Sequence, residues 1–227
     1  MNTGLDQYMD IFKDAVEDSA AKLTKSFEKI LIEVIILFMV IPRKINFTQL
    51  ERYGKRCEQC YRQTFTKEFD WIRYNMELMN TLFDRNDRKA IAIDPSYISK
   101  SGKHTPWIGY FWSGCAGQAK RGLEILGVGA IDIDKRDCVM LKAEQTPDTI
   151  TLDNVGCTLI DWYLKVLERI KDRLLEVSNY VVADAYFSKA TFAKGLDSMG
   201  FHLVSRLRDD ANLMYIHDGQ PTGKRGR

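Results

Sequence analysis

The hydrophobic positions of the first 41 residues recur with the spacing of an α-helix. One apolar stripe follows residues 5–16 and a second follows residues 23–35. Apolar residues that recur every three or four positions mark the buried face of an amphipathic helix. Acidic residues fill the other positions of the first stretch, which predicts a solvated face. Because Pro42 follows the second stretch and lacks a backbone N–H, the second helix is predicted to end there.

Residues 45–65 predict two short helices. Asn46 is suited to cap a helix, and Gln49 three positions later completes a start that resembles a capping box. Gly54 is expected to end this helix after about two turns, and a second helix is expected to begin near Arg56. Two short helices joined by a glycine turn are the outline of a helix-turn-helix. An ordinary helical hairpin with a charged exterior is the alternative.

From Lys89 onward the pattern changes to short β-branched runs separated by polar turns. This region predicts strands over residues 89–98, 107–113, 122–133, 138–143, 179–184 and 201–207, and helices over residues 154–176 and 189–199. The predicted class is α/β, with helices flanking a mixed sheet. We therefore expect an all-α domain over residues 1–86 and a sheet domain over residues 87–217. Residues 218–227 lack apolar periodicity and are expected to be disordered.

Two aspartates follow apolar runs of the predicted sheet. Asp94 ends the run 89–94 and Asp184 ends the run 180–184. A carboxylate on a buried strand is costly to desolvate unless it is compensated. Two such carboxylates brought together repel each other, and a divalent cation removes the repulsion. The pair therefore indicates a metal site. The alternative is that each aspartate caps its own turn.

Composition permits this interpretation without requiring it. A chain of 227 residues can bury one core and a small appended domain. The net charge of +2 is too small to indicate a nucleic-acid partner, so any basic surface must be local. Five cysteines without a framework predict a reducing, cytoplasmic compartment. Residues 31–41 contain Glu33 and are too few to span a bilayer, so no membrane partner is expected.

A local basic region lies over the predicted helix-turn-helix. Residues 41–67 contain seven lysines and arginines against two acids, a density that suits phosphate contact. Four polar side chains of the second helix should face outward if Cys57, Cys60, Tyr61 and Phe65 face the core. These four candidates for DNA contact are Arg56, Gln59, Arg62 and Gln63.

Residues 94–103 and 184–189 resemble the first and second acidic motifs of DDE transposases, most closely those of bacterial insertion sequences. The resemblance extends from about residue 30 to the end of the chain. It implies a ribonuclease H-like core in which Asp94 and Asp184 lie on neighbouring strands and hold Mg²⁺ (or Mn²⁺). The implied activity is phosphodiester cleavage and strand transfer at insertion-sequence ends. The implied partner is double-stranded DNA, and a homo-oligomer is compatible with it. Basic residues around the implied site would contact phosphates: Lys100, Lys103, Lys120, Arg121 and Lys189.

One element of the resemblance is missing. The family carries a third acidic residue in a Tyr-x-x-Arg-x-x-x-Glu pattern, which does not occur in this chain. We therefore expect a truncated transposase that is inactive alone and that leaves apolar surface on one sheet face exposed. A non-catalytic DNA-binding fragment, or an inhibitor of a full-length transposase, is the alternative function. A structural protein with a decayed core is the third.

Other motifs are weaker. Trp107, Tyr110, Phe111 and Trp112 could stack on bases or pack within a hairpin. Among the remaining acids, Asp132 and Asp134 fit a strand that runs into a turn, and Asp209 and Asp210 are poor candidates for a third ligand. Cys57-x-x-Cys60 lacks a second pair at zinc-finger spacing and is expected to lie on a helix face.

Overall fold

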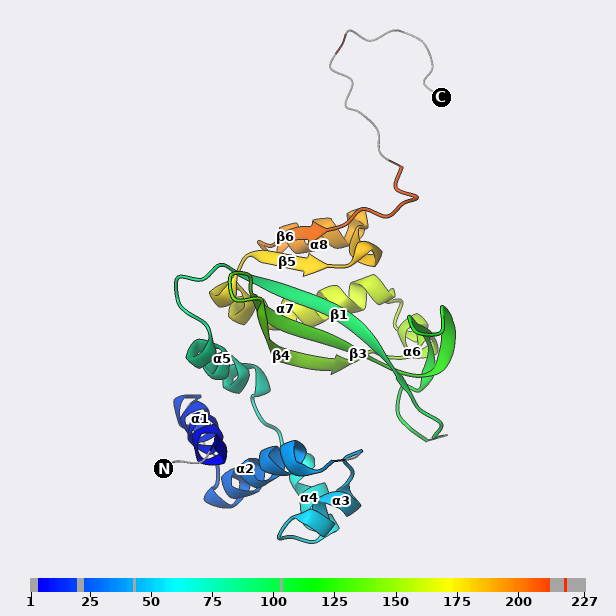
Figure 1. Ribbon diagram of the computed structural model, residues 1–227. Coiled ribbons are helices and arrows are strands. Elements are labelled where there is room, and N and C mark those ends of the chain that lie inside the picture. The colour runs from blue at the N-terminus through cyan, green and yellow to red at the C-terminus, as the bar shows by residue number, and fades with distance from the viewer. Residues whose placement is uncertain (1–3, 20–22, 43, 103, 213–218, 220–227) are drawn as a thin grey trace.

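The computed structural model describes residues 4–19, 23–42, 44–102, 104–212 and 219. Lys103 and the tail expected over residues 218–227, apart from Gly219, lie outside the described residues. Helices form one end of the protein, and a mixed sheet with its own helices forms the other (Figure 1). None of the helices in the described ranges has the length and apolar character needed to cross a membrane.

Among the described residues, the helical end contains five helices: α1 (Gly4–Asp18), α2 (Lys25–Val40), α3 (Phe47–Tyr53), α4 (Glu58–Phe65) and α5 (Trp71–Leu82). The two predicted N-terminal helices are confirmed as α1 and α2. The predicted short pair is confirmed as α3 and α4, and Asn46 caps α3 by accepting the Gln49 N–H at 2.9 Å. The sequence pattern did not indicate α5, which packs against α1 and β4.

Tyr61 ties the short helices to α2. Its ring is fully buried, and its hydroxyl donates to Glu33 Oε1 at 2.6 Å. The N–H of Lys55 donates to the same oxygen at 2.8 Å. Burial, followed by the hydrogen bond to Glu33, raises the pKa of Tyr61 to about 12. One carboxylate on α2 therefore holds both the turn between α3 and α4 and the centre of α4.

The prediction that Cys57 and Phe65 face the core is wrong. Cys57 is exposed at the N-terminal cap of α4, and Phe65 is 50% exposed at its end. Tyr61 and Thr64 are the buried residues of this helix. A helix of eight residues has only two turns, so only a few of its side chains face the core. An error in the predicted start of the helix therefore changes which residues are expected to be buried.

Replacement of Gly54 by alanine is expected to destabilise the packing of α3 and α4 against α2. A Cβ atom at this position would collide with the Tyr61 hydroxyl and the Leu50 carbonyl oxygen. Overpacking of this kind costs about 2–3 kcal/mol. Chemical denaturation followed by circular dichroism measures the loss. Gly4→Ala is the matched control, since a Cβ at Gly4 meets no atom within 4 Å. Equal stability of both variants would contradict the close packing at Gly54.

The sheet has six strands: β1 (Lys89–Ser99), β2 (Gly109–Ser113), β3 (Gln118–Asp132), β4 (Asp137–Gln145), β5 (Tyr180–Ala183) and β6 (His202–Ser205). The order is β2-β3-β1-β5-β6, and β4 also pairs with β3. The first four strands pair antiparallel, whereas β1, β5 and β6 run parallel. The predicted mixed α/β sheet with flanking helices is confirmed.

Three helices and a short turn accompany the sheet: α6 (Thr149–Asn154), α7 (Leu159–Val177), η1 (Ala185–Phe187) and α8 (Ala190–Ser198). The single helix predicted over residues 154–176 is wrong at its start. Gly156 adopts a positive φ of 59°, which interrupts the helix. Thr158 then begins α7 with a capping box completed by Asp161.

The two faces of the sheet differ. Ile91, Val128 and Val181 are fully buried in a cluster with α7 residues such as Leu167. Side chains that point away from α7 are partly uncovered: Tyr180 is 50% exposed, Val204 49% and Met140 55%. One sheet face therefore carries exposed apolar side chains, as the sequence predicts.

Candidate active site

The pairing of β1 with β5 brings the two predicted aspartates together. Ile91 lies opposite Val181, and Ala92 lies opposite Val182. Continuing this parallel register by two residues sets Asp94 opposite Asp184, whose backbone is still extended. Neighbouring strands are about 4.8 Å apart, and residues in register project from the same face. Two residues 90 positions apart thus become neighbours in space.

Each of the two carboxylates has one hydrogen-bonded oxygen and one oxygen without a partner among the described contacts. Ser96 Oγ donates to Asp94 Oδ2 at 3.3 Å, and the N–H of Tyr186 donates to Asp184 Oδ1 at 3.0 Å. Ser205 Oγ donates to the backbone oxygen of Asp184 at 2.7 Å and so ties it to β6. Both aspartates are exposed, so the prediction of buried carboxylates is wrong. The other oxygen of each is available to a cation.

The other acids that sequence reasoning weighed are engaged elsewhere. Asp132 is fully buried and accepts the N–H groups of Asp134 and Lys135, as expected of a strand that ends in a turn. Asp209 and Asp210 form ion pairs with Arg206 and Arg208 at 2.6 and 2.7 Å. Across the described residues, no group of three Asp, Glu, His or Cys side chains is placed to hold a metal ion.

A buried hydrogen bond lies behind Asp184. Glu124, on β3, is only 6% exposed, and its Oε1 accepts the Tyr163 hydroxyl at 2.6 Å. Burial, followed by the nearby Glu124 charge, raises the pKa of Tyr163 well above its usual range. The Tyr163 ring packs 5.4 Å from that of Phe187, in the η1 turn after Asp184. This pair supports the turn, and sequence reasoning missed it because the partners are 39 residues apart.

The predicted basic cluster around the aspartates is largely wrong. Lys189 does lie beside the site, with Nζ 4.1 Å from the centre of the Tyr186 ring. Lys100, Lys120 and Arg121 lie about six positions along β1 and β3 from Asp94 and its partner Gly127, which is roughly 20 Å along an extended strand. β1 and β3 pair over eleven residues, so the basic residues at the far end of this ladder lie away from the aspartates.

The second helix of the short pair presents a polar face. Gln59, Arg62 and Gln63 are exposed on α4, and Arg56 is partly exposed. Arg62 Nε donates to Glu58 Oε1 at 2.8 Å, and its guanidinium lies 4.5 Å from the Phe47 ring centre. Arg56 pairs with Glu33 at 3.4 Å. Both arginines already have partners within the chain, whereas the two glutamines point to solvent.

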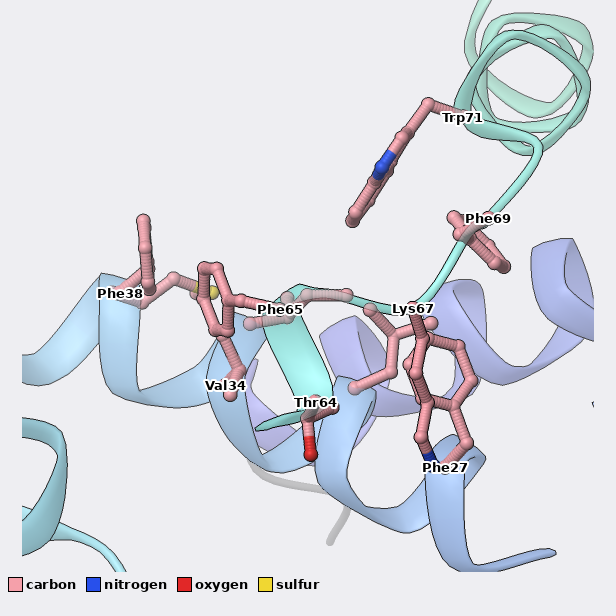
Figure 2. Close-up of a pocket in the computed structure, with 11 residues that line it drawn as sticks. Phe27, Val34, Phe38, Thr64, Phe65, Lys67, Phe69 and Trp71 are labelled. Carbon is pink, nitrogen blue, oxygen red and sulfur yellow. The ribbon is translucent and has the colours of Figure 1, made fainter. Parts of the chain in front are cut away.

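A second concave region lies at the helical end of the protein. It is an apolar groove of about 550 Å³ between α2 and the segment that joins α4 to α5. Figure 2 shows Phe65, Phe69 and Trp71 opposite side chains of α2 such as Phe38. Lys67 is the charged residue among its lining side chains, and it stacks 5.5 Å from the centre of Phe27. The groove offers no paired carboxylates, so the chemistry of the protein is better sought at Asp94 and Asp184.

Two of three comparisons with known proteins found a match. A family model described as DDE superfamily endonuclease matches residues 44–227. The cryo-EM structure of the piggyBac transposase synaptic complex with hairpin DNA is similar at 16% identity and a TM-score of 0.39, over 97% of this chain and 46% of that chain. The chain therefore spans less than half the length of that transposase. No match is found among curated protein sequences. Because the family match covers most of the chain, the protein belongs to the DDE superfamily of endonucleases.

Proposed function

We propose that this chain carries the first two acidic residues of a DDE transposase, which cleaves phosphodiester bonds in double-stranded DNA and joins the ends to a target. The observation that carries the proposal is the parallel register of Ile91 with Val181 and Ala92 with Val182, which supports Asp94 and Asp184 as neighbours when it is continued by two residues. The family match supports the endonuclease class. Insertion-sequence ends as the substrate are part of the same proposal.

The residues fit a divalent cation. Each aspartate has one carboxylate oxygen without a hydrogen-bond partner among the described contacts, and hard, short carboxylates suit Mg²⁺ or Mn²⁺. When bound, the cation supplies activation of an attacking hydroxyl and stabilisation of a leaving oxygen. The N–H of Tyr186 fixes the orientation of Asp184. The ammonium group of Lys189, held near the Tyr186 ring, could bind a backbone phosphate.

Direct measurement of cation binding tests the proposal. Asp94→Asn and Asp184→Asn are each expected to weaken Mn²⁺ binding by at least about tenfold, because loss of even an outer-shell partner costs 10–100-fold. Electron paramagnetic resonance of free Mn²⁺ gives the affinity. Asp153→Asn, at an exposed position of α6, is the matched control. Unchanged affinity in both active-site variants would overturn the proposal.

The activity of the chain alone, its compartment and its oligomeric state belong to the same proposal. The described residues supply no third acidic ligand, so we propose that residues 1–227 are inactive alone. Robust Mg²⁺-dependent strand transfer by the purified chain would contradict this. The five cysteines are free, which suits a reducing cytoplasm. A homo-oligomer is also proposed, and sedimentation analysis on DNA would measure it.

The second candidate function is DNA binding without catalysis, in which the chain occupies element ends or inhibits a full-length transposase. The exposed face of α4 favours this candidate. Gln59→Ala together with Gln63→Ala is expected to weaken duplex binding by at least about thirtyfold, since each of the two lost contacts to a base edge costs about 1–3 kcal/mol. Fluorescence anisotropy at low salt measures the change, and the exposed Gln7→Ala on α1 is the control. Binding that survives Asp94→Asn but not the glutamine changes would favour this function.

A further inference from the structure

Two aromatic side chains of β2 stand in solvent. Tyr110 is 70% exposed and Trp112 64% exposed, whereas Phe111 between them is 7% exposed. The sequence left open whether the aromatic residues of this segment pack or bind. The structure divides them: Phe111 is buried, and Trp107 contacts Trp162 at 6.3 Å between ring centres. Neither exposed ring contacts another ring among the described residues.

The register places these rings on the same sheet face as the first aspartate. Tyr110 lies opposite Arg121 on β3, and Asp94 lies opposite Gly127 on the same strand. Directly opposed residues share a face, and residues an even number of positions apart on a strand share it too. The two rings therefore project from the face that α7 does not cover, the face that carries Asp94.

Arg121 adds a fixed positive charge beside Tyr110. Its guanidinium donates to the carbonyl oxygen of Gly102 at 3.3 Å, and its own carbonyl oxygen accepts the Tyr97 hydroxyl at 2.8 Å. The arginine is thus held at the edge of the aromatic pair. Exposed rings next to a guanidinium suit a ligand that has both flat apolar surfaces and negative charge. Nucleic acid with accessible bases has this combination.

The distance between the Tyr110 and Trp112 side chains along β2 favours unpaired bases as the ligand. Side chains two positions apart on a strand are separated by about 6.7 Å, which is twice the rise of about 3.4 Å between stacked bases. One base plane therefore fits between two such rings. In a duplex both faces of a base are already stacked, so only an unpaired base can enter. The site lies roughly 20 Å along β3 from the partner of Asp94, a span that extended single strand can bridge.

We propose that Tyr110, Trp112 and Arg121 form a stacking site for unpaired bases of single-stranded DNA on the active-site face of the sheet. The proposal rests on the proposed function in that DNA is the ligand. It adds a site for the strand that becomes unpaired next to the cleavage position.

Binding of a fluorescein-labelled oligothymidylate to the purified chain, without divalent metal, tests the site. Trp112→Leu and Tyr110→Leu are each expected to weaken this binding about tenfold, and binding of a labelled duplex should change little. Trp112→Phe should retain most of the affinity because it keeps a π face. The control is Tyr8→Leu, at a 53% exposed position of α1. Thermal melting of each variant confirms that the fold is intact.

The outcomes separate this site from the proposed function. The stacking site is overturned if the leucine variants bind the single strand as tightly as the native protein does. It is also overturned if they lose affinity for the duplex as much as for the single strand. If that happens while Asp94→Asn loses Mn²⁺ binding, the stacking site fails and the proposed function stands. If the leucine variants lose single-strand binding while Asp94→Asn and Asp184→Asn both bind Mn²⁺ normally, the proposed function fails and the stacking site stands.

Discussion

Tyr163→Phe is expected to destabilise the protein by about 3 kcal/mol, because it leaves a buried acidic group without its donor. Glu124 is only 6% exposed, and the Tyr163 hydroxyl donates to it at 2.6 Å. A loss of this size changes the ratio of folded to unfolded protein roughly 150-fold. Urea denaturation followed by circular dichroism measures the difference.

Two further variants isolate the cause. In Tyr163→Phe with Glu124→Leu both polar partners are absent, and stability should recover in part because no buried polar group remains unpaired. Tyr180→Phe removes the same hydroxyl from a ring that is 50% exposed, and should alter stability by no more than about 0.5 kcal/mol. If Tyr163→Phe behaves like Tyr180→Phe, the buried hydrogen bond does not stabilise the protein.

The backbone arrangement of the site was predictable because it depends on strand order. Polar residues bound the apolar runs before Asp94 and Asp184, which predicted two strands. The resemblance to DDE transposases, with their ribonuclease H-like strand order, implied that these strands are neighbours. The parallel register of β1 and β5 agrees with that expectation. Capping residues were predictable because a cap acts locally: the Asn46 side chain accepts an N–H only three residues away.

Contacts between side chains distant in sequence were not predictable. The Glu124–Tyr163 bond depends on how α7 lies across β3, which a local pattern does not encode. The exposure of both aspartates was missed because each one directly follows the last buried residue of its apolar run, where the core no longer covers the strand. The spread of Lys100 and Arg121 follows from the length of the β1–β3 ladder, which the interrupted apolar pattern beyond Asp94 concealed.

Neutralising the two aspartates is expected to have opposite effects with and without metal. In EDTA, Asp94→Asn or Asp184→Asn should leave stability unchanged or raise it slightly, since two like charges on adjacent strands repel. In Mn²⁺ at a hundredfold excess over the dissociation constant, the native protein should gain about 2.7 kcal/mol, because the cation binds only the folded state. The variants, whose affinity is expected to be at least about tenfold weaker, should lose about 1.3 kcal/mol or more of that gain.

Thermal melting with and without Mn²⁺ measures both arms, and Asp153→Asn should follow the native protein in each. A structural role for the pair, in which each carboxylate only caps its own turn, predicts a different result. Asparagine keeps an oxygen that accepts the Tyr186 N–H and caps about as well as aspartate, so Asp184→Asn would leave stability unchanged, whereas Asp184→Ala would destabilise the protein by about 1 kcal/mol with or without metal. Mn²⁺ would then affect the native protein and the asparagine variants alike. The difference in Mn²⁺ stabilisation between the native protein and these variants therefore distinguishes a cation site from two separate caps, independently of any DNA substrate.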